Sequence, residues 1–373
     1  MAKQKIKTVI DEILEVADIK INGTRPWDAQ VNNDASYSRV IKDGSLGLGE
    51  SFMEGWWDTK ALDQLLYKVF SANLEQKILN NKKLLLQLFY EKFFNRQSKS
   101  KAFEVGEQHY DLGNDLYEAM LDKRMVYTCG YWKNAKNLDE AQEDKLDLIC
   151  RKLQLKKGMK VLDIGFGFGS FAKYAAQKYG VSVDGVTVSK EQLKYAQEYC
   201  KGLPINLELK DYRDIEGKYD RIVSIGMFEA VGHKNFRTYM KVVHDHLTDD
   251  GLTLLHTIGT MDRKNVKDPW IDKYIFVNGE LPNMFHVTNS IDKLFVMEDW
   301  HNFGAYYDLT LMAWHKNFEK NWSKLSGKYD ERFHRMWNFY LLSCAALFRA
   351  RKTQLWQIVL SKKGVKGGYE SIR

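Results

Sequence analysis

Strand and helix patterns alternate along the chain from about residue 159 to residue 260. Short apolar runs typical of strands occur in MKVLDIG, VSVDGVTV, INLELKD, DRIVSIG and LTLLHTIG. The segments between them, SFAKYAAQKYG, SKEQLKYAQEYC and HKNFRTYMKVVHDHL, predict helices. Such alternation predicts an α/β fold with a parallel, doubly wound sheet, to which TQLWQIVLS near the end adds a last strand. Ligands of such sheets bind at the carboxyl ends of the strands.

The rest of the 373 residues predicts a second, smaller domain. The expected boundaries are a small, mainly helical N-terminal domain, a polar linker and a large domain that carries the sheet, at residues 1–95, 96–104 and 105–373. Helices are expected near 61–71, 75–95, 111–122 and 138–153, and in the final third. A substrate lid is expected within 262–300.

Positive charge is modest overall but is concentrated in one segment. The net charge is +7, and Lys and Arg interleave with Leu and Phe in residues 77–101. This segment suits an anionic membrane surface better than nucleic acid, although a solvated helix face explains it equally well. The four cysteines have no paired or metal-type spacing, the N-terminus is too charged for a signal peptide, and no apolar run is long enough to span a bilayer. We therefore expect a cytoplasmic protein that contacts the inner face of the membrane from outside the bilayer.

A glycine-rich loop follows the first strand of the alternating region. VLDIGFGFGS places Gly165, Gly167 and Gly169 where the backbone turns tightly and a ligand approaches closely. The spacing is G-x-G-x-G and not the G-x-G-x-x-G of dinucleotide sites, and the second strand ends in Val-Thr-Val without an acid for a ribose. Both features argue against NAD and leave S-adenosylmethionine as the alternative.

Polar residues at the next strand ends fit an adenosine pocket. Asp163 ends the first strand, and KDYRD ends the third, with Asp211 placed near adenine and Tyr212 against its face. Gln192 has two interpretations: a ribose contact, or a capping box with Ser189 at the start of the next helix. Neither is favoured by the sequence.

A lone carboxylate, Glu229, ends the apolar strand YDRIVSIGMFEAVG. Burying a carboxylate costs several kcal/mol of folding free energy unless a charged or hydrogen-bonding group pairs with it. Alone, Glu229 could cap the helix that begins near His233, and His256 could be a satisfied core histidine. Cys129 and Tyr307 could equally be ordinary buried residues. The placement of all four residues at strand ends and in flanking loops favours a shared functional site.

Several motifs, in the same order, resemble those of the cyclopropane-fatty-acid synthases. They are GSLGLGESFMEGWWD, MVYTCGYW, VLDIGFGFGSFAKYAA, VTVSKEQ, DYRD, YDRIVSIGMFEAVG, LLHTIG, DPWIDKYIFVNGELP and MEDWHNFGAYYDLTLMAW. The resemblance covers essentially the whole chain, including the front segment that the related mycolic acid cyclopropane synthases lack. Phe166 and Phe168 stand where Cys and Trp are common in the family. The resemblance implies a class I methyltransferase, Rossmann-like, with a mostly parallel seven-stranded sheet.

The resemblance also implies an activity and its partners. The family transfers the methyl of S-adenosylmethionine to a cis double bond of an unsaturated phospholipid acyl chain, and a bound bicarbonate then removes a proton so that a cyclopropane ring closes. It implies membrane phospholipids as substrate, a homodimer assembled through the front domain, and no nucleic acid or metal. A related lipid methyltransferase giving a methyl-branched or methylene product is the near alternative, and a small-molecule N- or O-methyltransferase is the more distant one.

The implied site residues fall into two sets. Bicarbonate is held by Cys129, Glu229, His256, the backbone of Ile258, and Tyr307, of which all but Ile258 are the catalytic side chains. The cofactor set lies near the amino acid end and around the nucleoside and comprises Tyr127, Thr128, Gly165, Gly167, Thr187, Gln192, Asp211, Tyr212 and Arg213.

Overall fold

The computed structural model describes residues 2–72, 112–261 and 267–373, which form two compact units. The first, called the helical unit, comprises Met1–Ala119, Lys267–Val277 and Trp314–Lys352. The second, called the catalytic unit, comprises Met120–Val266, Asn278–Ala313 and Thr353–Arg373.

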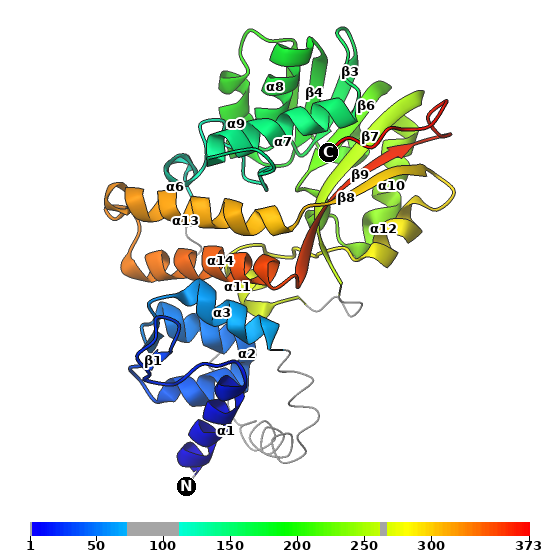
Figure 1. Ribbon diagram of the computed structural model, residues 1–373. Helices are drawn as coiled ribbons and strands as arrows, with labels where there is room; N and C mark the ends of the chain where they lie inside the picture. The colour runs from blue at the N-terminus through cyan, green and yellow to red at the C-terminus, as the bar shows by residue number, and fades with distance from the viewer. Residues whose placement is uncertain (1, 73–111, 262–266) are drawn as a thin grey trace. The chain divides into compact units, whose positions relative to one another are not determined.

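The catalytic unit is built on a seven-stranded sheet of order β5-β4-β3-β6-β7-β9-β8 (Figure 1). The strands are β3 (Lys160–Ile164), β4 (Ser182–Thr187), β5 (Ile205–Leu209), β6 (Tyr219–Ile225), β7 (Leu247–Thr260), β8 (Val296–Asn302) and β9 (Thr353–Ser361). β3 to β7 pair in parallel, whereas β9 pairs antiparallel with both β7 and β8. The predicted seven-stranded, mostly parallel, doubly wound sheet is confirmed.

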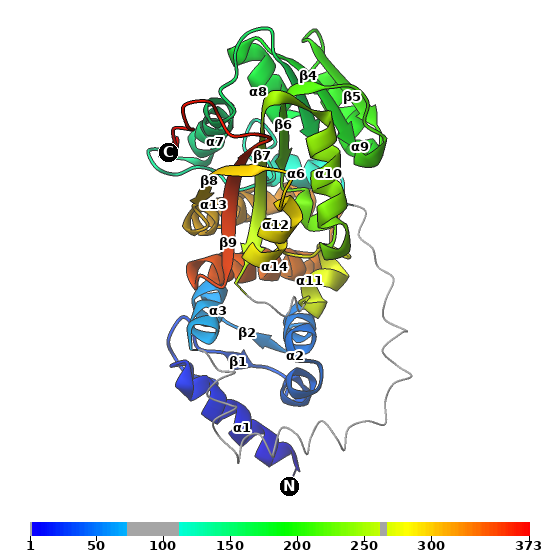
Figure 2. The ribbon, with the colours of Figure 1, turned by 90° about the vertical axis from the view of Figure 1, so that its right-hand side faces the viewer.

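Helices cover both faces of this sheet (Figure 2). On one face lie α7 (Leu138–Lys152), α8 (Ser170–Tyr179) and α9 (Lys190–Tyr199), and on the other lie α10 (Phe236–His246) and α12 (Met284–Ile291). Alternate strand residues point to opposite faces, so Val161 and Val223 pack under α7 and α8 while Leu162 and Ile222 pack under α10. Burial on both faces explains why these strands read as continuous apolar runs.

The segment predicted as a substrate lid, residues 262–300, contributes to both units. Its described part forms α11 (Pro269–Tyr274) in the helical unit and α12 in the catalytic unit, and its end becomes the edge strand β8. The sequence VMEDWHN of β8 mixes polar and apolar residues on a half-buried edge, so it lacks the apolar run that identified the other strands.

The helical unit draws on distant parts of the chain. It contains α1 (Ala2–Val16), β1 (Gln30–Val31), α2 (Ala35–Met53), β2 (Trp57–Asp58), α3 (Leu62–Ser71), most of α6 (Asn114–Met120), α11, the later part of α13 (Ala305–Leu325), and α14 (Glu331–Arg349). This division differs from the predicted boundaries at 95 and 105, because α14 packs against α2 and α3 and completes their core. The expected helix at 75–95, the basic stretch 77–101 and the linker 96–104 lie outside the described residues.

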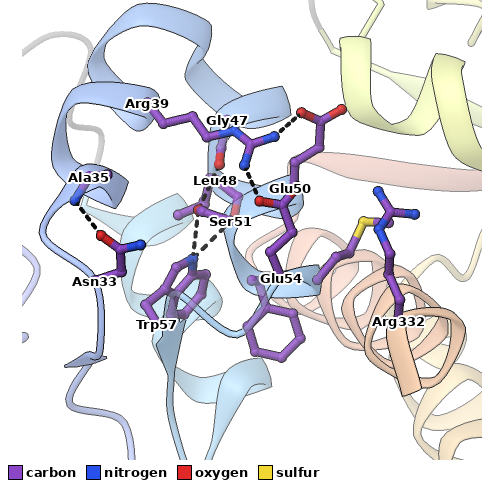
Figure 3. Close-up of polar contacts among 12 residues, drawn as sticks. Asn33, Ala35, Arg39, Gly47, Leu48, Glu50, Ser51, Glu54, Trp57 and Arg332 are labelled. Atoms are coloured by element: carbon purple, nitrogen blue, oxygen red, sulfur yellow. Dashed lines mark hydrogen bonds and ion pairs between the residues drawn. The ribbon is translucent and has the colours of Figure 1, made fainter. Parts of the chain in front are cut away.

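The motif GSLGLGESFMEGWWD forms the second half of α2 and its exit (Figure 3). Gly44 has φ 59° and kinks the helix there. Trp57 then folds back, and its Nε1 donates to the carbonyl of Leu48 and to Oγ of Ser51, each at 3.1 Å. Arg39 forms ion pairs with Glu50 and with Glu54, each at 2.6 Å. The motif therefore has a structural role within the helical unit.

Across the residues with described positions, no helix combines the length and apolar character needed to cross a bilayer. Nor do His, Cys, Asp and Glu gather in any group of three that could hold a metal ion within those same residues.

Candidate active site

The glycine loop joins the end of β3 to the start of α8. Gly165, Gly167 and Gly169 all have positive φ, at 81°, 57° and 82°. A side chain at Gly165 would overlap Met227, whereas the space beside Gly167 is open. The positive φ values of the three glycines and the open space beside Gly167 leave room for the ligand that the sequence predicts there.

Asp163 lies at the end of β3 beneath this loop. Its carboxylate is buried, and neither oxygen has a hydrogen-bond partner among the residues that the structure describes. Burial raises its pKa to about 7, and the charge of Lys145 opposes the rise. A buried carboxylate without a partner fits the cationic amino group of S-adenosylmethionine.

The predicted nucleoside residues lie at the carboxyl ends of β4 and β5. Ser189 caps α9 by accepting from the backbone N–H of Gln192 at 3.3 Å, while the Gln192 side chain contacts Oγ1 of Thr187 at 3.4 Å. Only the first half of the predicted capping box is therefore present, and the Gln192 side chain faces Thr187, a member of the predicted cofactor set.

Asp211 and its neighbours form a short turn after β5. Its carboxylate accepts from the backbone N–H of Arg213 at 2.9 Å and pairs with that guanidinium at 2.8 Å, which lowers the pKa of Asp211. The ring of Tyr212 lies 5.2 Å from that of Tyr239 on α10. Arg213 thus holds Asp211 in place at the strand end.

Residues 127–129 form one short segment that contributes to both predicted sites. Tyr127 and Thr128 belong to the predicted cofactor set, and Cys129 belongs to the predicted bicarbonate set. Gln142 on α7 donates to the carbonyl of Thr128 at 2.7 Å, and Nζ of Lys145 donates to its Oγ1 at 2.9 Å. Thr310 on α13 accepts from the backbone N–H of Gly130 at 3.0 Å and lies 3.8 Å from Sγ of Cys129. Cys129 is fully buried, which raises the pKa of its thiol far above the usual range and keeps it neutral.

Gln142, Lys145 and Thr310 were missed from the sequence. The first two lie on the buried face of α7, in a stripe that also contains Ile149 and Lys152. Polar residues at i, i+3 and i+10 within an otherwise apolar face were the available signal, because a buried lysine is rarely without a partner.

Glu229 follows β6 in the short helical turn Phe228–Ala230, after Gly226 with φ 71°. Its Oε1 accepts from the backbone N–H of Ile258 at 2.6 Å. Its Oε2 is buried and has no hydrogen-bond partner in residues 2–72, 112–261 and 267–373. Burial raises its pKa to about 7. The alternative role as a helix cap is wrong, since the backbone N–H of His233 donates to Glu280 at 3.0 Å.

His256 lies on β7, in register with Ile225 of β6 and Gln357 of β9. Its Nδ1 contacts Nε2 of Gln357 at 3.2 Å, and its buried Nε2 has no partner within the described parts of the chain. Burial holds the pKa of His256 well below 6.5, so the ring is neutral. With Nδ1 accepting from the amide, Nε2 carries the proton and is a hydrogen-bond donor.

The five residues predicted to hold an anion are brought together in part. Glu229 and Ile258 are in direct contact, and His256 precedes Ile258 by two residues on the same strand. Cys129 contacts Thr310, which follows the buried Tyr307 by one turn of α13. The backbone N–H of Ile258, expected to bind the anion, instead donates to Glu229.

Burial of Glu229 predicts a stability that depends on pH. Because its pKa rises from 4.5 to about 7 on folding, the folded state binds this proton more tightly than the unfolded chain does. That stabilisation is complete below pH 4.5 and is lost as the pH rises through about 7. Glu229→Gln is therefore expected to be more stable than wild type by roughly 1–3 kcal/mol near pH 8, with little difference at low pH. Urea unfolding at both pH values measures this, and a variant less stable at pH 8 would contradict it.

Comparison with known proteins identifies the family of this chain. The mycolic acid cyclopropane synthetase family matches residues 97–358. The chain is 52% identical over 365 residues to the cyclopropane-fatty-acyl-phospholipid synthase of Escherichia coli K12, covering 98% of this chain and 95% of that protein. It is 37% identical over 280 residues to a probable fatty acid methyltransferase of Pseudomonas putida, covering 72% of this chain and 71% of that protein.

Solved structures give the same result. The cyclopropane synthase MmaA2 of Mycobacterium tuberculosis matches with a TM-score of 0.65 and 30% identity, covering 68% of this chain and 96% of that one. Mycolic acid cyclopropane synthase CmaA1, solved with S-adenosylhomocysteine (SAH) and CTAB, matches with a TM-score of 0.64 and 30% identity over the same shares. The chain belongs to the cyclopropane-fatty-acyl-phospholipid synthase family and is an S-adenosylmethionine-dependent methyltransferase.

Proposed function

We propose that the protein methylates a cis double bond of an unsaturated phospholipid acyl chain and closes a cyclopropane ring, with bicarbonate as the base. The observation that carries this proposal is a pair of buried polar atoms, Oε2 of Glu229 and Nε2 of His256, that have no hydrogen-bond partner in the described structure. Glu229 directly follows β6, and His256 lies on the neighbouring strand β7. Similarity to a phospholipid synthase over 98% of the chain supports the substrate class.

The reaction makes three physical demands on the site. S-adenosylmethionine supplies an electrophilic methyl group when bound, and a weakly nucleophilic alkene must be held in line with it. The resulting cation must be stabilised without being captured, which aromatic faces do. Phe303, whose ring lies 6.0 Å from that of His256, is the aromatic side chain that we assign to this role. A base must then take a proton from the added methyl group.

The residues fit bicarbonate as that base. His256 Nε2–H and the hydroxyl of Tyr307 would donate to it, Glu229 Oε2 would accept its O–H, and the neutral Cys129 thiol would line the site without adding charge. We do not assign the backbone of Ile258 a direct contact with bicarbonate, because its N–H donates to the Glu229 carboxylate. Glu229 in its charged form would then receive the proton from bicarbonate.

Lipid mass spectrometry tests the proposal. Purified protein is incubated with S-adenosylmethionine, bicarbonate and vesicles of monounsaturated phospholipid. The expected product has gained one CH₂ and has lost its double bond to a cyclopropane ring. If the lipid is unchanged, the proposal fails.

The same cation can also give a methyl-branched or methylene product. The 37% identity to a probable fatty acid methyltransferase keeps this alternative in view. Fragmentation of the product acyl chain separates the two, because only the branched and methylene products keep a methyl or exomethylene carbon outside a ring.

We further propose that the front part of the chain, residues 1–95, supports membrane docking and dimer assembly at the cytoplasmic face. The basic and apolar composition of 77–101 supports an anionic bilayer as partner. Sedimentation with anionic and with zwitterionic vesicles tests the docking, and light scattering of the full chain tests the dimer.

A further inference from the structure

A lysine on α7 is buried directly behind residues 127–129. Lys145 is 1% exposed, and its Nζ donates to Oγ1 of Thr128 at 2.9 Å. One turn earlier on the same helix, Gln142 donates to the main-chain carbonyl of Thr128 at 2.7 Å. α7 therefore holds both the backbone and the side chain of Thr128.

The acids around Lys145 leave its charge partly unneutralised. Asp122 uses its two oxygens to accept the backbone N–H groups of Val126 and Arg124, at 2.9 Å and 3.0 Å. Asp163 makes no hydrogen bond to a described residue. Burial lowers the pKa of Lys145 to about 8, and the nearby carboxylates of Asp122 and Asp163 oppose this fall. A buried ammonium of this kind is costly for stability, which favours a functional reason for it.

The contacts of Thr128 fix the direction of its hydroxyl. A side-chain carbon added at Gly226 would come within 2.7 Å of Cγ2 of Thr128, so the Thr128 methyl packs closely on that glycine. The hydroxyl oxygen meanwhile accepts from Lys145. A hydroxyl has one proton and two lone pairs, so accepting from an ammonium leaves its own proton to be donated elsewhere. Donation from a positive group also strengthens that second bond.

We propose that Lys145 is a positioning residue for the methyl donor, because it fixes Thr128 as a hydrogen-bond donor to the carboxylate of S-adenosylmethionine. This inference rests on the proposed cofactor role of Thr128 and adds the residue that sets its polarity. Lys145 acts through Thr128 and touches no reacting atom. Its positive charge, one residue removed, also favours the negative carboxylate over a neutral group.

A pair of ligands separates this role from a structural one. SAH carries the amino acid carboxylate, whereas 5′-methylthioadenosine has the same nucleoside and a thioether without the amino acid. Calorimetry on the full-length protein is expected to show that Lys145→Met weakens SAH binding by roughly 10- to 100-fold, the loss typical of a hydrogen bond to a charged group. Binding of 5′-methylthioadenosine is expected to be unchanged.

Two further variants complete the test. Thr128→Val removes the hydroxyl at constant shape and should cause the same selective loss, and adding Lys145→Met to it should cost no more, because the two act as one unit. Lys145→Gln keeps a neutral donor and should retain most of the SAH affinity. It also gives a measurement if Lys145→Met fails to fold.

Two results would overturn the inference: SAH binding to Lys145→Met that equals wild type, or an equal loss for both ligands. The second would make Lys145 a structural residue. If the wild-type protein binds neither ligand, the proposed cofactor site itself fails, and that is seen before any variant is made.

Discussion

Replacing Glu229 by Gln is expected to lower the rate of ring formation by about 10²- to 10⁴-fold, the usual contribution of a positioned proton-transfer group. Glutamine keeps an oxygen that can accept the N–H of Ile258, so the 2.6 Å contact that holds the side chain survives. What it loses is the capacity to take a proton at the Oε2 position. Lipid mass spectrometry against time measures the rate, and SAH affinity is expected to be unchanged.

Glu280→Gln is the matched control for this substitution. Glu280 is a neighbouring carboxylate whose backbone N–H donates to the carbonyl of Glu229 at 2.8 Å, while its side chain bonds His233. It has no proposed part in proton transfer, so its variant should form the ring at nearly the wild-type rate. Ring formation that persists in Glu229→Gln would remove Glu229 from the mechanism.

If Glu229 receives the proton as proposed, the reaction is expected to slow at acidic pH. Burial raises the pKa of Glu229 to about 7, so below that pH the group already holds a proton and cannot receive one. The value of kcat/KM should fall tenfold for each pH unit below about 7. Glu280→Gln should keep this profile.

Replacing Trp270 by Ala is expected to destabilise the helical unit by roughly 3–5 kcal/mol, the usual cost of removing a buried tryptophan. Trp270 is 1% exposed, its ring lies 4.7 Å from that of Phe339 on α14, and its Nε1 donates to the sulfur of Met53 at 3.4 Å. A side chain at Gly49 would overlap the indole, so the ring packs directly on the backbone of α2. Urea unfolding followed by circular dichroism measures the change.

Phe276→Ala tests whether this effect comes from burial. Phe276 belongs to the same short segment of the helical unit but is 44% exposed. Its removal should cost less than about 1 kcal/mol. Equal losses in the two variants would show that the whole 267–277 segment, and not the indole, stabilises the unit.

The sheet was predictable because its signal is local. β3, β4 and β6 are mostly buried strands rich in apolar residues, and the next α-helices along the chain are α8, α9 and α10, respectively. β8 was not predicted, because this edge strand is half-buried and mixes polar and apolar residues. The membership of the helical unit was hidden for another reason: the packing of α14 on α2 and α3 joins residues that are far apart in sequence, and no local pattern records that pairing.

The site shows the same contrast. Glu229 and His256 were selected from the sequence because a carboxylate follows one apolar strand and an imidazole interrupts the next. Gln357 and Thr310 were not identified from the sequence, because each forms a hydrogen bond with a residue from a distant part of the chain. Such contacts depend on strand register and on the rotation of a helix about its axis. The contact between Ile258 and Glu229 likewise depends on how the turn after β6 is oriented against β7.

The pairing of β9 with β7 has a consequence for the order in which the protein becomes active during synthesis. Glu229 and His256 are translated long before β9, which spans residues 353–361. Nδ1 of His256 nevertheless depends on β9 for its hydrogen-bond partner, the side-chain amide of Gln357. In a nascent chain that stops before β9, His256 therefore lacks the partner that sets its tautomer. Under the proposed mechanism, the proton-transfer part of the site is therefore complete only once β9 has been made and has paired with β7.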